Sequence, residues 1–241
     1  MSIAEHYRAL LASRYTWMMG GPECCLAAAR ELLNSVGLLT SRSGAALDLG
    51  CGAGYHARVL AEAGMQVIAV DNSADLLREA AHVCKGFNVV PVQSELSDSR
   101  QYAAHGPFSV VLCVGDTLTH LGSRLAVDEL LASAVRLLTP GGVLLLEFRE
   151  QPRDLAGEAA VLTLRAERDR IMQCVLHFEP DRVWVTDVVH EWMGSRWETI
   201  KSTYPKLRLR AADILASAAA AGMTVKGDST QAGRRVLAFS S

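Results

Sequence analysis

The chain has 241 residues, a formal net charge of −2 and a sequence pI of about 6.4; half of its residues are hydrophobic and 21% are charged. This composition is that of an ordinary soluble protein, and the length suits one α/β domain with an appended element. Because no basic excess exists to neutralise a phosphate backbone, nucleic acid is not an expected partner, and without an apolar run of ~18 residues neither is a membrane.

The cysteines and the first residues bear on the compartment. The six cysteines include an adjacent pair, Cys24 and Cys25, and no two have C-x-x-C spacing. This pattern does not suit a zinc site or a disulfide framework, so no metal is expected. The segment "MSIAEHYRALL" carries charges where a signal peptide needs an apolar core. A reducing, cytoplasmic location is therefore predicted.

The first 150 residues alternate between helical and strand-like segments. Helices are expected at 3–13 and 22–38, separated by an aromatic stretch that Gly20, Gly21 and Pro22 interrupt. Apolar strands then follow at 45–50, 66–71, 87–93, 108–114 and 143–148, with helices at 55–64, 73–84 and 124–138 between them. Continuous apolar strands that take turns with helices predict an α/β fold with a Rossmann-like, doubly wound sheet of seven strands.

After residue 150 the pattern changes to four strand-like pieces at 161–167, 170–179, 182–192 and 197–204. They predict an antiparallel β meander inserted after the fifth strand, followed by a helix at 211–222 and strands at 223–228 and 234–240. The expected division is an N-terminal helical lid (1–43), a core (44–150 and 209–241) and an insertion on the substrate side (151–208). Exposed edges of the meander make a homodimer one expected assembly.

Two details of the meander are open to interpretation. Alternate residues from Trp184 to Trp192 share one strand face, which either roofs a substrate pocket or packs on the sheet. Further on, Lys206, Arg208 and Arg210 alternate with leucines and are expected on the solvated side of a strand.

The stretch "LDLGCGAGYH" at 47–56 follows the first strand with glycines at 50, 52 and 54. Such a loop either lets a ligand approach bare backbone or is only a tight turn into the helix. The spacing is not the G-x-G-x-x-G of nicotinamide-binding enzymes, because Tyr55 takes the place of the third glycine. Asp71 ends the second strand and is either a partner for the hydroxyls of a ribose or a helix-entry carboxylate. Together these features favour a bound nucleoside.

These segments, with "FSVVLCVGDTLTHL" and "LLTPGGVLLLEF", resemble the motifs of class I S-adenosylmethionine-dependent methyltransferases, in the same order over roughly residues 44–150. The resemblance implies S-adenosylmethionine as cofactor, with the glycine loop against its methionine portion, Asp71 at the ribose and Glu95 at the adenine. The cofactor-binding residues that it implies are Asp48, Gly50, Cys51, Gly52, Gly54, Asp71, Asn72, Glu95, Leu96, Val114 and Gly115.

A narrower resemblance is to glycine N-methyltransferase and related small-molecule enzymes. It rests on Gly115 to Leu121, on Arg149 after the fifth strand and on "STYPKLRL", which contains Tyr204. It implies that Arg149 and Tyr204 bind substrate, although Arg149 alternatively forms a salt bridge with Glu147 or Glu150. Asp116 and His120 are the candidate catalytic bases; alternatively, Asp116 holds an ammonium or a hydroxyl, or caps its loop, and His120 is a hydrogen-bonded structural residue.

The aromatic N-terminal segment completes the predicted site. In the enzymes that this chain resembles, the corresponding segment folds over the cofactor, so Tyr15 and Trp17 are expected either to cover the sulfonium or to pack in the core. The expected function is methyl transfer to nitrogen or oxygen of a small, carboxylate-bearing molecule. A catalytically silent binding protein of the same fold is the alternative, and a nicotinamide-dependent oxidoreductase is disfavoured by the glycine spacing.

Overall fold

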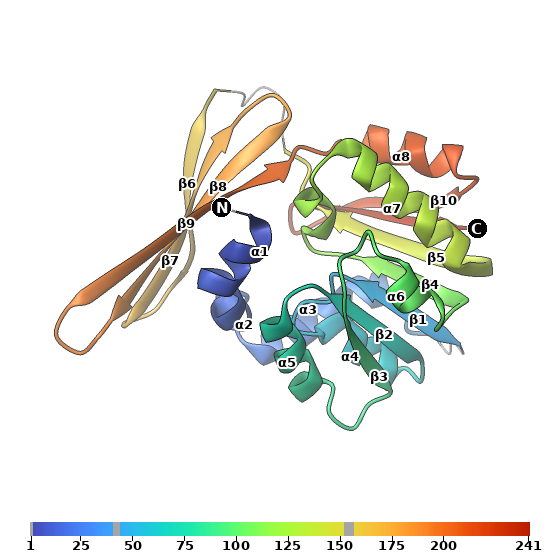
Figure 1. Cartoon of the computed structure of the whole chain (residues 1–241), viewed down its shortest axis with the longest axis horizontal. Helices are drawn as coiled ribbons and strands as arrows, with labels where there is room; N and C mark the ends of the chain where they lie inside the picture. Colours follow the sequence, from blue (N-terminus) through green and yellow to red (C-terminus); the bar gives the residue numbers. More distant parts are fainter. Residues whose placement is uncertain (1, 41–43, 152–156) are drawn as a thin grey trace.

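A seven-stranded sheet forms the larger part of the fold, with its strands in the order β10-β11-β5-β4-β1-β2-β3 (Figure 1). The computed structural model describes residues 2–40, 44–151 and 157–241. The parallel strands are β1 (Ala45–Leu49), β2 (Gln66–Asp71), β3 (Val89–Gln93), β4 (Phe108–Cys113) and β5 (Leu138–Phe148). Antiparallel β11 (Arg234–Ser240) and β10 (Thr224–Gln231) extend the sheet beyond β5. The predicted Rossmann-like α/β fold is confirmed.

Helices cover both faces of this sheet. One face packs against α3 (Pro22–Ser35), α4 (Tyr55–Glu62) and α5 (Ala74–Val83), and the other against α6 (Arg100–Ala103), α7 (Arg124–Leu137) and α8 (Ala211–Ala220). Successive strand residues alternate between the two cores: on β1, Ala46 belongs to the first and Leu47 to the second, and both are fully buried. Burial on both sides explains why these strands are continuously apolar.

The inserted meander is a separate four-stranded antiparallel sheet, in the order β6-β7-β8-β9. Its strands are β6 (Ala159–Ala166), β7 (Arg170–Phe178), β8 (Arg182–Trp192) and β9 (Trp197–Leu207). On β8 the buried face carries Val183, Val185, Asp187 and Val189. The face from Trp184 to Trp192 therefore neither roofs the pocket nor packs on the larger sheet. Both faces are apolar enough to be buried, and the buried one is the face that carries Val183, Val185 and Val189.

A helical segment from Ile3 to Met18 lies between the two sheets (Figure 1). It comprises α1 (Ile3–His6), a π-helical turn η1 (Tyr7–Leu11), a 3₁₀ turn η2 (Ala12–Arg14) and α2 (Tyr15–Met18), and is called the N-terminal helix below. Ser2 and Glu5 form a capping box at its start. The helix thus continues five residues beyond the predicted end at residue 13, and the chain turns only at Gly20 and Gly21, both of which have positive φ.

The basic cluster at the end of β9 and after it is only partly solvated: the Lys206 side chain is 21% exposed and that of Arg210 is 43% exposed. The Lys206 ammonium pairs with Asp116, the Arg208 guanidinium donates to the Glu179 carbonyl, and Arg210 pairs with Asp213. Asp116 and Glu179 lie far from Lys206 and Arg208 along the chain, which the alternation of charge and leucine could not reveal.

The predicted division into three parts stays a prediction. Its boundaries at 43/44 and 150/151 border residues 41–43 and 152–156, which lie outside the described residues. Within the described ranges, no helix is both long enough and apolar enough to cross a membrane.

Candidate active site

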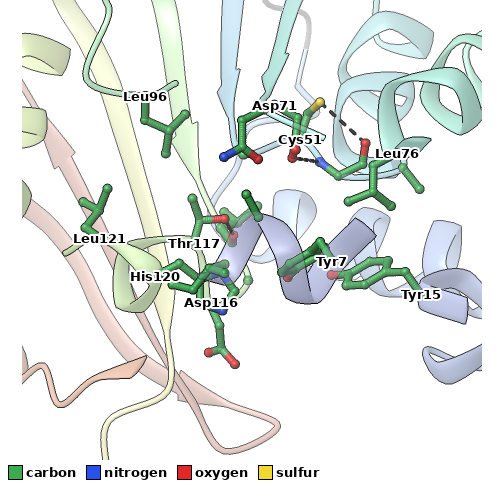
Figure 2. A pocket seen from close by; sticks show the side chains of 18 of the residues that line it. Tyr7, Tyr15, Cys51, Asp71, Leu76, Leu96, Asp116, Thr117, His120 and Leu121 are labelled. Carbon is green, nitrogen blue, oxygen red and sulfur yellow. Dashed lines mark hydrogen bonds between the residues drawn. The ribbon is translucent and has the colours of Figure 1, made fainter. Parts of the chain in front are cut away.

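A cavity of about 520 Å³ opens where β1, β2 and β4 end, between the seven-stranded sheet and the N-terminal helix. Figure 2 shows Asp71 and Leu96 on one side of it, Asp116, Thr117 and His120 at another, and Tyr7 and Tyr15 entering from the N-terminal helix. Every described residue that lines the cavity lies between Ile3 and Ala126, so within that set the four-stranded sheet contributes none.

The glycine loop lies along the wall of the cavity formed by the core. Gly50 has a φ of +75°, and a Cβ there would lie 2.5 Å from Thr117 Oγ1, so the position admits only glycine without rearrangement. Gly54 has a different role: a Cβ built there would lie only 2.9 Å from the Cβ of Ala80, so glycine allows α5 to pack closely on the loop. Gly50, Cys51 and Gly52 line the cavity, whereas Gly54 is not among the described lining residues.

Asp71 accepts a hydrogen bond from this loop and lines the cavity. Its Oδ2 accepts a hydrogen bond from the Gly52 amide at 2.9 Å, and its Oδ1 accepts one from the Ser73 amide at 2.8 Å. Burial raises the pKa of Asp71 above its ordinary value, although these amide hydrogen bonds oppose the shift. Each oxygen keeps a lone pair that can accept from a ribose hydroxyl.

Beyond Asp71 the cavity continues along the ends of β2 and β3. Asn72, Glu95 and Leu96 all line it, and the Asn72 amide donates to Glu95 Oε1 at 3.1 Å. Val114 and Gly115, which follow β4, line the opposite side. The positions implied for the ribose and the adenine are therefore adjacent.

Asp116 lines the cavity and makes three polar contacts. Its Oδ2 lies 2.9 Å from Lys206 Nζ, its Oδ1 lies 3.1 Å from the Arg234 guanidinium, and the Arg149 amide donates to Oδ1 at 3.3 Å. Burial disfavours the ionised carboxylate, but Lys206 and Arg234 overcome this effect and hold the pKa of Asp116 well below its usual range. Asp116 is thus a fixed negative charge and a poor proton acceptor.

His120 ends the short 3₁₀ turn η3 (Thr117–His120) next to Asp116. Its ring meets Tyr7 and Tyr204 edge-on, at centroid distances of 5.8 and 5.9 Å. Burial first, and then the Lys206 ammonium, lowers its pKa to about 3, so the imidazole is neutral at physiological pH. His120 Nε2 is buried and has no hydrogen-bond partner among the described residues, although the side chain lines the cavity.

Four other predicted site residues do not line the cavity among the described residues. Asp48 is fully buried beneath the loop, where burial and then Asp71 raise its pKa to about 7. Arg149 is exposed. Tyr204 is buried and stacks on His6 at 4.1 Å. Trp17 packs between two arginines of the four-stranded sheet. Tyr15, by contrast, lies against the loop, with its Cε1 4.0 Å from a Cβ built on Gly52.

Sequence reasoning did not identify Tyr7, His56, Lys206 and Arg234. Tyr7 and His56 line the cavity, and the "EHYRALL" segment offered the same aromatic signal as the one that pointed to Tyr15. Lys206 and Arg234 are 90 and 118 residues from Asp116 along the chain. No local pattern could have paired them with it.

Comparison with known proteins identifies the domain. Residues 46–142 match a family described as "Methyltransferase domain". Residues 46–142 of this chain form a methyltransferase domain. The glycine loop, the Asp71 carboxylate and the aromatic rings of Tyr7 and Tyr15 suit the backbone contacts, ribose and sulfonium of S-adenosylmethionine, the cofactor that the sequence motifs imply.

Relatives of the methyltransferase domain act on different acceptors. A glycine/sarcosine N-methyltransferase from Parasynechococcus marenigrum (strain WH8102) is 31% identical over 117 residues, covering 48% of this chain and 41% of that protein. A ubiquinone biosynthesis O-methyltransferase from Xanthomonas campestris pv. campestris (strain B100) is 34% identical over 142 residues, 57% of each chain. This chain therefore matches less than two thirds of the length of either relative.

The fold as a whole resembles that of CalS10, an amino pentose methyltransferase from Micromonospora echinaspora solved with S-adenosylmethionine bound. The TM-score is 0.76, with 19% identity over 93% of both chains. The likeness includes the parts outside the matched domain, and at this identity it concerns the fold alone.

Proposed function

We propose that this protein transfers a methyl group from S-adenosylmethionine to nitrogen or oxygen of a small molecule. The observation that carries the proposal is that His120 lines the same cavity as the glycine loop and Asp71, while its buried Nε2 has no hydrogen-bond partner among the described residues. A nucleophile that bears N–H or O–H would supply the missing hydrogen-bond partner.

The residues of this chain would contribute to methyl transfer mainly by aligning the methyl donor with the acceptor. When bound, S-adenosylmethionine supplies an electrophilic methyl group on a sulfonium. Holding donor and acceptor in line, away from water, can contribute roughly 7 kcal/mol or more to such a displacement. A neutral His120 that resists protonation would accept a hydrogen bond from the N–H or O–H of the methyl acceptor. This hydrogen bond would orient the lone pair of the acceptor atom toward the methyl group. Asp116 would present a fixed negative charge to the positive charge that develops on an attacking amine.

The carboxylate expected on the acceptor remains a finer part of this proposal. Lys206 and Arg234 pair with the Asp116 carboxylate that lines the cavity, whereas the contact of Arg149 with Asp116 is made by its backbone amide. We expect Arg149→Ala to change kcat/KM less than Lys206→Met does. A larger effect of Arg149→Ala would favour the predicted carboxylate contact.

The first experiment is calorimetric titration of the protein with S-adenosylmethionine, S-adenosylhomocysteine and NADH, followed by assay of amine and hydroxyl acceptors for S-adenosylhomocysteine production. We expect both adenosyl ligands to bind and NADH not to bind. For an acceptor that turns over, His120→Gln should lower kcat about 10–100-fold, the scale of one lost hydrogen bond in a buried site. The exposed His105→Gln is the matched control.

The outcomes separate the alternatives. Adenosyl binding without turnover of any amine or hydroxyl acceptor would support the silent binding protein. NADH binding alone would contradict the proposal.

A further inference from the structure

The N-terminal helix presents two stripes of side chains to different parts of the protein. Ile3, Tyr7, Tyr15 and Met19 line the cavity. His6, Leu10, Arg14 and Trp17, spaced four, four and three residues apart, contact the four-stranded sheet. Such spacing places each set along one side of a helix. The side chains that meet the ligand are thus held from behind by a sheet that contributes none of the described lining residues.

Trp17 lies at the centre of one of these attachments. The guanidinium carbon of Arg170 lies 5.0 Å from the ring centroid and that of Arg165 lies 5.6 Å from it, both within cation–π range. Arg170 also pairs with Glu191 at 3.0 Å, and Glu191 binds Arg14 through both of its oxygens, at 2.8 and 3.1 Å. Four residues around Trp17 therefore form one connected network between β6, β7, β8 and the helix.

Only one residue separates Trp17 from Tyr15, whose ring faces Gly52 of the glycine loop. Between them Thr16 hydrogen-bonds Tyr55 and Glu79, and the chain turns immediately afterwards at Gly20 and Gly21. The contacts of Thr16 join the end of the helix to the core, and those of Trp17 join it to the four-stranded sheet, so the position of Tyr15 depends in part on the packing of Trp17.

We propose that Trp17 is a positioning residue for cofactor binding: by holding the helix on the four-stranded sheet, it places Tyr15 over the methionine half of the cavity. This proposal depends on the proposed binding of S-adenosylmethionine, and it does not depend on the identity of the methyl acceptor. The four-stranded sheet then contributes to ligand affinity without touching the ligand.

The two halves of the cofactor provide the test. S-adenosylhomocysteine fills both the adenosine end, at Asp71 and Glu95, and the end next to Tyr15; adenosine fills only the first. We expect Trp17→Leu to raise the Kd for S-adenosylhomocysteine about 10-fold, consistent with the loss of two cation–π contacts. The Kd for adenosine should change by less than about 2-fold, since its contacts lie on the core.

Rescue and control variants complete the design. Trp17→Phe keeps an aromatic face for both guanidinium groups and should bring the Kd for S-adenosylhomocysteine back to within about 3-fold of the original value. Trp197→Leu removes a tryptophan of the same sheet that contacts Trp192 and is 44% exposed, and it should leave both constants unchanged. Titration calorimetry of all four proteins with both ligands gives the required constants.

Three results would overturn the proposal. Equal weakening of both ligands by Trp17→Leu would indicate a general structural role, and unchanged binding of both would remove Trp17 from the site altogether. If the unsubstituted protein bound neither ligand, the proposed function would fail as well, which the other two results leave intact. Should Trp17→Leu not fold, Arg170→Met tests the same network, with the same split between the two ligands expected.

Discussion

The two walls of the cavity are built in opposite ways. The wall formed by the core consists of backbone and short loops at the ends of parallel strands, where Gly50, Gly52 and Asp71 are fixed by neighbouring amides. The wall formed by the N-terminal helix consists of side chains on one irregular helix, fixed by residues more than 150 positions away, such as Asp187 and Glu191. The first wall is rigid because of local geometry, whereas the second depends on distant contacts.

Because of this difference, we expect the loss of one distant partner of the N-terminal helix to lower the stability of the protein. His6 Nε2 lies 3.0 Å from Asp187 Oδ2, and the two side chains are 0% and 4% exposed. His6→Phe leaves the Asp187 carboxylate buried without its partner and should lower the free energy of unfolding by about 3–5 kcal/mol. Urea denaturation measures this loss. The double variant His6→Phe/Asp187→Leu, which removes both polar groups, should recover most of it; equal losses in the two variants would contradict the role of the pair.

The wall formed by the core should instead be destabilised by steric clashes in the glycine loop. Gly50→Ala brings a methyl group against Thr117 at a positive φ and should destabilise the protein by about 2–4 kcal/mol. Gly64→Ala is the control, because Gly64 has a φ of +95° with nothing within 4 Å of an added Cβ. Its cost should be only the backbone strain of about 1 kcal/mol. Denaturation curves of equal midpoint for the two variants would show that the contact with Thr117 is unimportant.

The smallest effect is expected from a carboxyl group beneath the core wall. Burial raises the pKa of Asp48 from an ordinary value of 3.8 to about 7, so the folded state holds its proton more tightly than the unfolded state. Its contribution to stability is complete below about pH 4 and is lost as the pH rises toward 7 and above. Asp48→Asn should therefore reduce the loss of stability between pH 5 and pH 8 by about 1–2 kcal/mol.

Chemical denaturation at both pH values checks this expectation. Asp169→Asn, at an exposed carboxyl group, is the control and should leave the pH dependence unchanged. A pH dependence of Asp48→Asn identical to that of the original protein would mean that Asp48 titrates normally.

The same contrast explains what the sequence could predict. Gly50, Asp71 and Glu95 follow successive strands, so their grouping at one edge of the sheet follows from the parallel topology alone. The partners of Asp116 could not be predicted, because Lys206 and Arg234 lie on β9 and β11 and only the folded sheets bring them together. The buried face of β8 was equally undetermined, since valines alternate with tryptophan and threonine and either face fits a core.

The confinement of the described cavity lining to residues before 127 has a consequence for synthesis. A ribosome completes every described cavity residue before it makes Arg165, Arg170, Asp187 or Glu191, which hold the helical wall. The nascent chain would thus carry Tyr7 and Tyr15 on a helix that lacks its contacts with the four-stranded sheet until Glu191 had been made. Capture of the cofactor by both walls belongs to the last stage of folding, when contacts of large sequence separation form.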